Sequence, residues 1–166
     1  MVKTSTRHVY ALALGSNRPL SARMTPACLL SGAVRLIAEL GPVLSVAPVM
    51  QTRPIGPSRR IFVNGAVLME SSLPPEEMLS GLQAIERALG RQRFRRWGPR
   101  WLDIDIILWS GGRWNSRSLR IPHPAFRERD FVLTPLLAIA PGWRDPVSRL
   151  SIRHLRFRLR KAVSGG

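Results

Sequence analysis

The sequence predicts an α+β domain whose strand and helix signals follow the order strand, helix, strand, strand, helix, strand. Four short runs are rich in aliphatic and β-branched residues, and two longer segments repeat apolar residues at a spacing near 3.6. Gly and Pro mark the turns between them. With 166 residues, 45% hydrophobic and 22% charged, the chain has the composition of one folded domain. We expect a single domain over 1–166, with a core at about 9–141 and a basic C-terminal tail at about 145–166.

The N-terminal half supplies three strands and the first helix. Pro26 suits the first turn of a helix, and Gly41 followed by Pro42 is a common way for a helix to end. Between the second and third strands, Pro54 and Gly56 indicate a loop. The predicted elements are strands at 8–14, 43–50 and 61–70 and a helix at 26–40.

The C-terminal half supplies the second helix and the fourth strand. Pro75 suits the start of that helix, Glu76 and Glu77 complement its dipole, and Gly90 ends it. We predict a helix at 75–89, a strand at 102–109, a small hairpin before 120, a helix at 127–140, and then a short helix or frayed tail. The order is the split βαβ, ferredoxin-like βαββαβ arrangement. It implies an antiparallel sheet with two main helices on one face, here followed by C-terminal additions.

Two carboxylates interrupt the fourth predicted strand, which is otherwise strongly apolar. Side chains two residues apart on a strand share a face, so Asp103 and Asp105 point the same way, roughly 7 Å apart. The opposite face is predicted to carry Leu102, Ile104, Ile106 and Leu108. Two neighbouring carboxylates on a mostly buried strand repel each other and lose hydration unless cations lie between them. Hard oxygen ligands suit Mg²⁺, so the pair predicts a magnesium site.

An arginine cluster precedes this strand and indicates what the metal would help to bind. Guanidinium groups bind phosphate in bidentate fashion, so metal carboxylates beside arginines suggest a polyphosphate substrate. The alternative is a pair of solvated aspartates, each paired with an arginine, because structural ion pairs are also common. The cluster contains Arg91, Arg93, Arg95, Arg96 and Arg100.

The charge of the chain raises a second class of function. The formal net charge is +16, and all but Lys3 and Lys161 of the 26 basic residues are arginine. Such a surface attracts nucleic acid at low salt, so a basic nucleic-acid-binding module is the alternative function. The arginines are spread along the chain, however, and no RNP, helix-turn-helix or zinc-finger pattern is present. We therefore expect no specific nucleic-acid partner.

Other features narrow the class of protein further. The single cysteine, Cys28, excludes an intramolecular disulfide and fits a reducing compartment. No apolar run reaches the length of a signal-peptide core or a membrane span, so we expect a cytoplasmic protein with no membrane partner. The chain has no G-x-x-x-x-G-K-[ST] pattern, so a P-loop cannot hold the phosphates.

Several blocks of the sequence together form a specific pattern. The blocks are Ala13-Leu-Gly-Ser-Asn17, Thr52-x-Pro54-x-Gly56-Pro57, Phe62-Val-Asn64, Gln83-x-x-Glu86, Gly90-Arg91-x-Arg93-x-x-Arg96-Trp97-Gly98-Pro99-Arg100-x-Leu102-Asp103-x-Asp105-Ile106, Pro122-His123-Pro124 and Arg129-x-Phe131-Val132-Leu133-x-Pro135-Leu136. This pattern resembles the 6-hydroxymethyl-7,8-dihydropterin pyrophosphokinase family of folate biosynthesis. The blocks run in the family's order and near its spacing, and the run around Asp103 is the most specific of them.

The resemblance implies an enzyme that transfers diphosphate from ATP to 6-hydroxymethyl-7,8-dihydropterin and releases AMP, with two Mg²⁺ ions held by Asp103 and Asp105. It also implies that the partners are these two substrates, and we expect the protein to be a monomer. The catalytic residues would be Arg91, Arg100, Asp103 and Asp105. The ATP-binding residues would be Gln83, Glu86, Arg93, Arg96, Ile106, His123 and Arg129. The pterin-binding residues would be Thr52, Arg53, Ile55, Phe62, Asn64, Trp97 and Phe131.

Without the resemblance, most of these residues have ordinary interpretations. Phe62 and Phe131 would be core residues, and a His between two prolines would be a loop residue. Gln83 and Glu86 share a helix face and would be ordinary polar residues exposed to solvent. A catalytically silent, pterin-binding relative is a third possible function, although such a copy would not be expected to keep its costly charged cluster.

Overall fold

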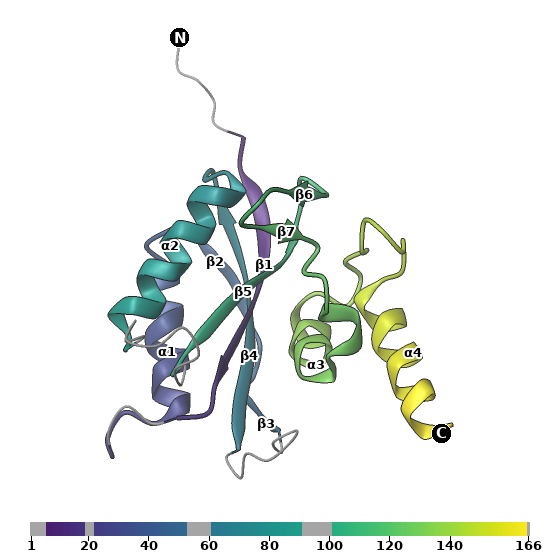
Figure 1. Cartoon of the computed structure of the whole chain (residues 1–166), viewed down its shortest axis with the longest axis horizontal. Coiled ribbons are helices and arrows are strands. Elements are labelled where there is room, and N and C mark those ends of the chain that lie inside the picture. The colour runs from purple at the N-terminus through teal and green to yellow at the C-terminus, as the bar shows by residue number, and fades with distance from the viewer. Residues whose placement is uncertain (1–5, 19–21, 53–60, 91–100, 166) are drawn as a thin grey trace.

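The computed structural model describes residues 6–18, 22–52, 61–90 and 101–165. Its central sheet is antiparallel, with the strand order β2-β4-β1-β5, and β3 pairs with β4 beside β2 (Figure 1). The strands are β1 (His8–Ser16), β2 (Val43–Val46), β3 (Met50–Thr52), β4 (Phe62–Ser71) and β5 (Asp103–Trp109). This is the order that the ferredoxin-like arrangement requires, so the predicted fold class is confirmed.

One face of the sheet is covered by α1 (Pro26–Ile37) and α2 (Pro75–Ala88), as Figure 1 shows. Tyr10, Leu12 and Leu14 alternate along β1 and pack against the apolar stripes of both helices. The two helix starts follow their sequence signals. Thr25 Oγ1 accepts a hydrogen bond from the backbone N–H of Cys28 at 3.3 Å, and α2 begins at a proline.

The opposite face is covered by α3 (Asp130–Ile139), with α4 (Ile152–Ser164) packed beyond it (Figure 1). A short 3₁₀ turn (Phe126–Glu128) leads into α3. The sheet presents Ala11, Ala13 and Ala66 on this face, and these small side chains let the helix approach the strands closely. The C-terminal segment contains a helix from Ile152 and is not a frayed tail, because Ile152 and Leu155 are buried against this layer. None of the helices in the described residues is long and apolar enough to cross a bilayer.

The strand β5 differs from its prediction at one residue. Its pairing with β1 passes from Leu12 opposite Ile106 to Ala11 opposite Leu108, so Ile107 is an extra, bulged residue. The expectation that Leu108 shares a face with Ile104 and Ile106 is wrong. A bulge reverses the faces that follow it, and Leu108 instead lies with Ile107 in the α3 layer.

Two further boundaries differ from the sequence prediction, whereas the predicted small hairpin is confirmed. The expected strand at 43–50 is two strands, β2 and β3, interrupted by Pro48, which has no N–H for the ladder. The helix expected at 127–140 begins only at Asp130. The small hairpin is present as β6 (Trp114–Asn115) and β7 (Arg120–Ile121).

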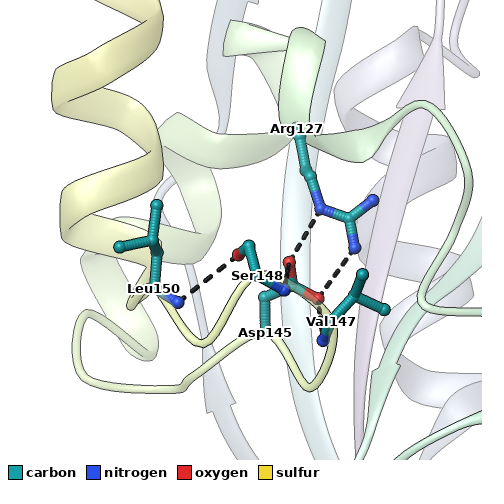
Figure 2. Close-up of polar contacts among 5 residues, drawn as sticks. All are labelled: Arg127, Asp145, Val147, Ser148 and Leu150. Carbon is teal, nitrogen blue, oxygen red and sulfur yellow. Dashed lines mark hydrogen bonds and ion pairs between the residues drawn. The ribbon is translucent and has the colours of Figure 1, made fainter.

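The connection between α3 and α4 is fixed by a buried ion pair (Figure 2). Asp145 is 0% exposed, and its two carboxylate oxygens accept hydrogen bonds from Arg127 Nε and Nη2 at 2.7 and 2.8 Å. The backbone N–H groups of Val147 and Ser148 donate to the same oxygens at 3.1 and 3.0 Å. Burial alone would raise the pKa of Asp145, but these hydrogen bonds outweigh it and hold the pKa well below its usual range.

Candidate active site

A cavity of about 500 Å³ lies at the end of the sheet where β1 finishes and β4 and β5 begin, on the face that α3 covers. The strand ends, the turn after β1 and the start of α3 all contribute to it. Its lining residues are Ala13, Leu14, Gly15, Ser16, Asn17, Phe62, Asn64, Asp103, Asp105, Glu128, Arg129, Phe131 and Val132.

The register of the sheet explains why this cavity is open beside the two carboxylates. Gly15 on β1 lies between Asn64 on β4 and Asp103 on β5, so one row across the sheet has no side chain in its middle. In the next row Ala13 pairs with Asp105. Because cross-strand neighbours on one face lie about 5 Å apart, a large residue at either β1 position would fill the space beside the carboxylates. The predicted shared face of Asp103 and Asp105 is confirmed.

Two aromatic rings and a buried amide line the same cavity. Phe62 and Phe131 are each half-buried, from β4 and α3 respectively. The Asn64 side chain is 4% exposed, and its Nδ2 donates a hydrogen bond to Thr52 Oγ1 at 2.8 Å. That bond fixes the orientation of the amide. The guanidinium carbon of Arg129 lies 5.7 Å from the centre of the Phe131 ring, within cation–π range.

His123 lies close to the carboxylates without lining the cavity. Its backbone N–H donates to Ile107 O at 3.0 Å, and its Nδ1 accepts from the N–H of Ala125 at 3.2 Å. The pKa of His123 is lowered, chiefly because the ring is buried. The Asp105 carboxylate opposes this effect, and the positive charge of Arg129 adds to it. A neutral ring whose Nδ1 accepts a hydrogen bond carries its proton on Nε2, so it presents a neutral donor there.

Besides His123, three predicted ATP-binding residues do not line the cavity. Ile106 is buried in the core beneath α1 and α2. Glu86 is 4% exposed on α2, and its Oε1 accepts a hydrogen bond from the backbone N–H of Ile104 at 2.8 Å. Gln83 is half-buried on the same helix. Seven other predicted site residues fall outside the described part of the chain: Arg53, Ile55, Arg91, Arg93, Arg96, Trp97 and Arg100.

The cavity also contains residues that sequence reasoning did not assign. Ser16 and Asn17 could have been found, because they lie at the end of β1, the strand beside β5. Within the described residues, the Ser16 hydroxyl is buried and has no hydrogen-bond partner. Glu128 and Val132 come from the 3₁₀ turn and α3, and no local pattern indicates that these elements reach the sheet end.

The donor set at the sheet end fits a metal that arrives with its own ligands. Among the described residues, no group of three or more His, Cys, Asp and Glu side chains could hold a metal ion. Asp103 and Asp105 supply hard carboxylate oxygens, and Mg²⁺ is commonly held by one or two carboxylates together with substrate phosphates and water. The pair therefore fits Mg²⁺ bound to a nucleotide better than a metal enclosed by protein.

Comparison with known proteins identifies the family. A family model described as 7,8-dihydro-6-hydroxymethylpterin-pyrophosphokinase matches residues 11–141. The chain belongs to this pyrophosphokinase family. The match begins in β1 and ends just after α3, so it includes every lining residue of the cavity, whereas α4 lies beyond it.

Relatives in the pyrophosphokinase family are enzymes named 2-amino-4-hydroxy-6-hydroxymethyldihydropteridine pyrophosphokinase. The one from Haemophilus influenzae is 36% identical over 142 residues, which cover 84% of this chain and 86% of the relative. The one from Synechocystis is 44% identical over 105 residues, which cover 63% of this chain and 54% of the relative. The chain thus spans about half the length of that relative.

A crystal structure of Plasmodium falciparum HPPK-DHPS has the same fold. The two structures superpose with a TM-score of 0.74 at 14% sequence identity. The alignment covers 95% of this pyrophosphokinase-family chain and 46% of the Plasmodium chain. The likeness supports the ferredoxin-like arrangement with the helices packed on both faces.

Proposed function

We propose that this chain transfers the terminal diphosphate of ATP to the hydroxymethyl oxygen of 6-hydroxymethyl-7,8-dihydropterin. One observation supports this proposal above the others. Two carboxylates that would bind the metal, Asp103 and Asp105, line the same cavity as two aromatic rings and a buried amide. A flat, polar-edged ring and a polyphosphate would each find suitable groups there, next to one another.

The aromatic part of the cavity suits the pterin. A pterin is flat and has hydrogen-bond donors and acceptors along its edges, so Phe62 and Phe131 would stack on its faces. Asn64, held by Thr52, would bind the pterin edge through its amide. Trp97 and the segment with Arg53 and Ile55 complete the proposed pterin-binding set on the basis of the family resemblance.

The carboxylate part suits the phosphates. Asp103 and Asp105 would hold two Mg²⁺ ions, which when bound would neutralise the phosphate oxygens around the β-phosphorus. Arg129 and the Nε2–H of a neutral His123 would bind phosphate oxygens, together with Arg91, Arg93, Arg96 and Arg100.

In the proposed reaction the pterin hydroxymethyl oxygen forms a bond to the β-phosphorus, and the bond from that phosphorus to the α–β bridging oxygen breaks. AMP leaves, and the hydroxyl proton is released. The protein's task is to hold both substrates in line and to exclude water.

The nucleotide would reach α2 because β5 is the last strand of the sheet in the described part of the chain. A nucleotide with its phosphates at Asp103 and Asp105 would pass the outer edge of β5 to bring its base near Gln83. Ile106 would then contribute through its backbone, because its side chain is buried. We further infer a cytoplasmic monomer, in keeping with the single cysteine, Cys28.

Product analysis tests this proposal directly. The protein is mixed with MgATP and 6-hydroxymethyl-7,8-dihydropterin, and the nucleotide and pterin products are separated by chromatography. AMP and the pterin diphosphate in equal amounts are expected. ADP would contradict diphosphate transfer, and pterin binding without turnover would instead indicate a catalytically silent relative. Filter binding to RNA at two salt concentrations tests the nucleic-acid alternative, which requires binding that survives physiological salt.

A further inference from the structure

The outer edge of β5 is held at two points that flank Asp105. Because β5 is the terminal strand of the described sheet, its outward-facing backbone groups need partners other than a strand. Glu86 Oε1 accepts from the N–H of Ile104 at 2.8 Å, and the N–H of His123 donates to Ile107 O at 3.0 Å. Both contacts come from other elements, α2 and the segment after β7.

The Glu86 contact lies where the strand most needs support. Pairing between β1 and β5 ends at Gly15 and Asp103, and the Ile104 peptide links Asp103 to the rest of the strand. Strand ends fray readily when their backbone groups are exposed to solvent. Glu86 prevents this from a rigid position, because it is 4% exposed and the adjacent Ile85 is packed in the core between α2 and the sheet.

We propose that Glu86 is a positioning residue for the metal-binding carboxylates. By accepting the Ile104 hydrogen bond, it sets the backbone between Asp103 and Asp105 and thus the spacing of their oxygens. This inference rests on the proposed function, and it gives Glu86 a different role from the direct ATP contact that the family resemblance implies. Groups that orient metal-binding residues typically change metal affinity or activity 10- to 100-fold when they are removed.

The test compares three variants of the full chain. Glu86→Ala removes the acceptor, Glu86→Gln keeps an Oε1 acceptor, and Glu77→Ala removes an exposed carboxylate from the same helix as a matched control. Two readouts do not depend on turnover: the hydrogen-exchange rate of the Ile104 amide by NMR, and Mn²⁺ binding in the presence of a non-hydrolysable ATP analogue by electron paramagnetic resonance. The turnover number is measured in parallel.

We expect Glu86→Ala to speed exchange at Ile104 by about tenfold or more, and to weaken Mn²⁺ binding and reduce turnover by about 10- to 100-fold. Glu86→Gln should restore both exchange and Mn²⁺ binding to within about threefold of the wild type. Normal Mn²⁺ binding in Glu86→Ala, or equal losses in the Ala and Gln variants, would overturn the proposal.

Two provisions keep this test decisive. If Glu86→Ala does not fold, Glu86→Asp replaces it, because a carboxylate one methylene shorter should lengthen the bond to Ile104 and shift both readouts in the same direction. If the wild type makes no AMP, the proposed function fails, whereas amide exchange and Mn²⁺ binding still decide the role of Glu86.

Discussion

Asp145 lies buried between α3 and α4, whereas Asp103 and Asp105 are half-buried on β5 and line an open cavity. Arg127 and two backbone N–H groups fill the hydrogen-bonding capacity of Asp145 from within the protein. Glycine and alanine beside the β5 pair leave space for a ligand. The difference shows that a fully buried carboxylate held by hydrogen bonds stabilises the fold, whereas a half-buried carboxylate that lines an open cavity can also meet a ligand.

The largest expected effect is a loss of turnover, without a loss of stability, when a carboxylate of β5 is removed. Asp103→Ala or Asp105→Ala should reduce turnover by about 1,000-fold or more, because the proposed metal ions lose a ligand. The melting temperature should stay near that of the wild type, since neither side chain is enclosed by the core. Steady-state kinetics and circular dichroism measure the two quantities. Near-normal activity in either variant would contradict the proposed role of the pair.

At the Arg127–Asp145 ion pair we expect the opposite result, a loss of stability without a loss of turnover. Arg127→Ala leaves Asp145 buried without its cationic partner, so the free energy of unfolding should fall by about 3 kcal/mol. Urea denaturation measures this loss, and Arg113→Ala, which removes an arginine just before β6 and outside this ion pair, is the matched control. The turnover number of the folded fraction should be unchanged. A loss of turnover larger than the loss of folded protein would show that the two regions are coupled.

The contribution of Asp145 to stability should also depend on pH. The lowered pKa of Asp145 means that the unfolded chain takes up a proton at a higher pH than the folded chain does. This contribution to stability is complete above the ordinary carboxyl pKa of about 4 and is lost as the pH falls below it. Unfolding measured from pH 6 to pH 3 should show the loss. The loss should be smaller in Asp145→Asn, and an identical pH dependence in that variant would exclude Asp145 as its source.

The smallest expected effect concerns the loop that contains Asp145. Arg149 has a φ of 64°, in the left-handed region that favours glycine. Arg149→Gly should therefore raise the free energy of unfolding by about 0.5–1 kcal/mol, with activity unchanged. Thermal unfolding measures the shift, and Arg144→Gly serves as a comparison at a residue without positive φ. A destabilised Arg149→Gly variant would mean that the arginine side chain contributes more than the strain costs.

The alternation of the β5 sequence was sufficient to predict the shared face of Asp103 and Asp105, because a period of two is a local property. The bulge at Ile107 was not predictable, since it depends on the register with β1. The apolar face of α2 likewise predicted its packing but gave no sign that Glu86 reaches the Ile104 amide.

The carboxylates of the two regions also differ in how clearly the sequence reveals them. The carboxylates of β5 stand out because charge interrupts an apolar run, but Asp145 lies in a polar stretch and gives no such signal. Its partner Arg127 is 18 residues away and meets it only through the packing of α3 and α4. Phe62 and Phe131 come together from β4 and α3, and residue patterns alone would have assigned both to the core.

A structure of the chain with Mg²⁺ and a non-hydrolysable ATP analogue tests the central claim most directly. The account predicts two metal ions held by the oxygens of Asp103 and Asp105, each also bound to the phosphates. Phosphates bound elsewhere, or metal ions without either carboxylate among their ligands, would contradict it.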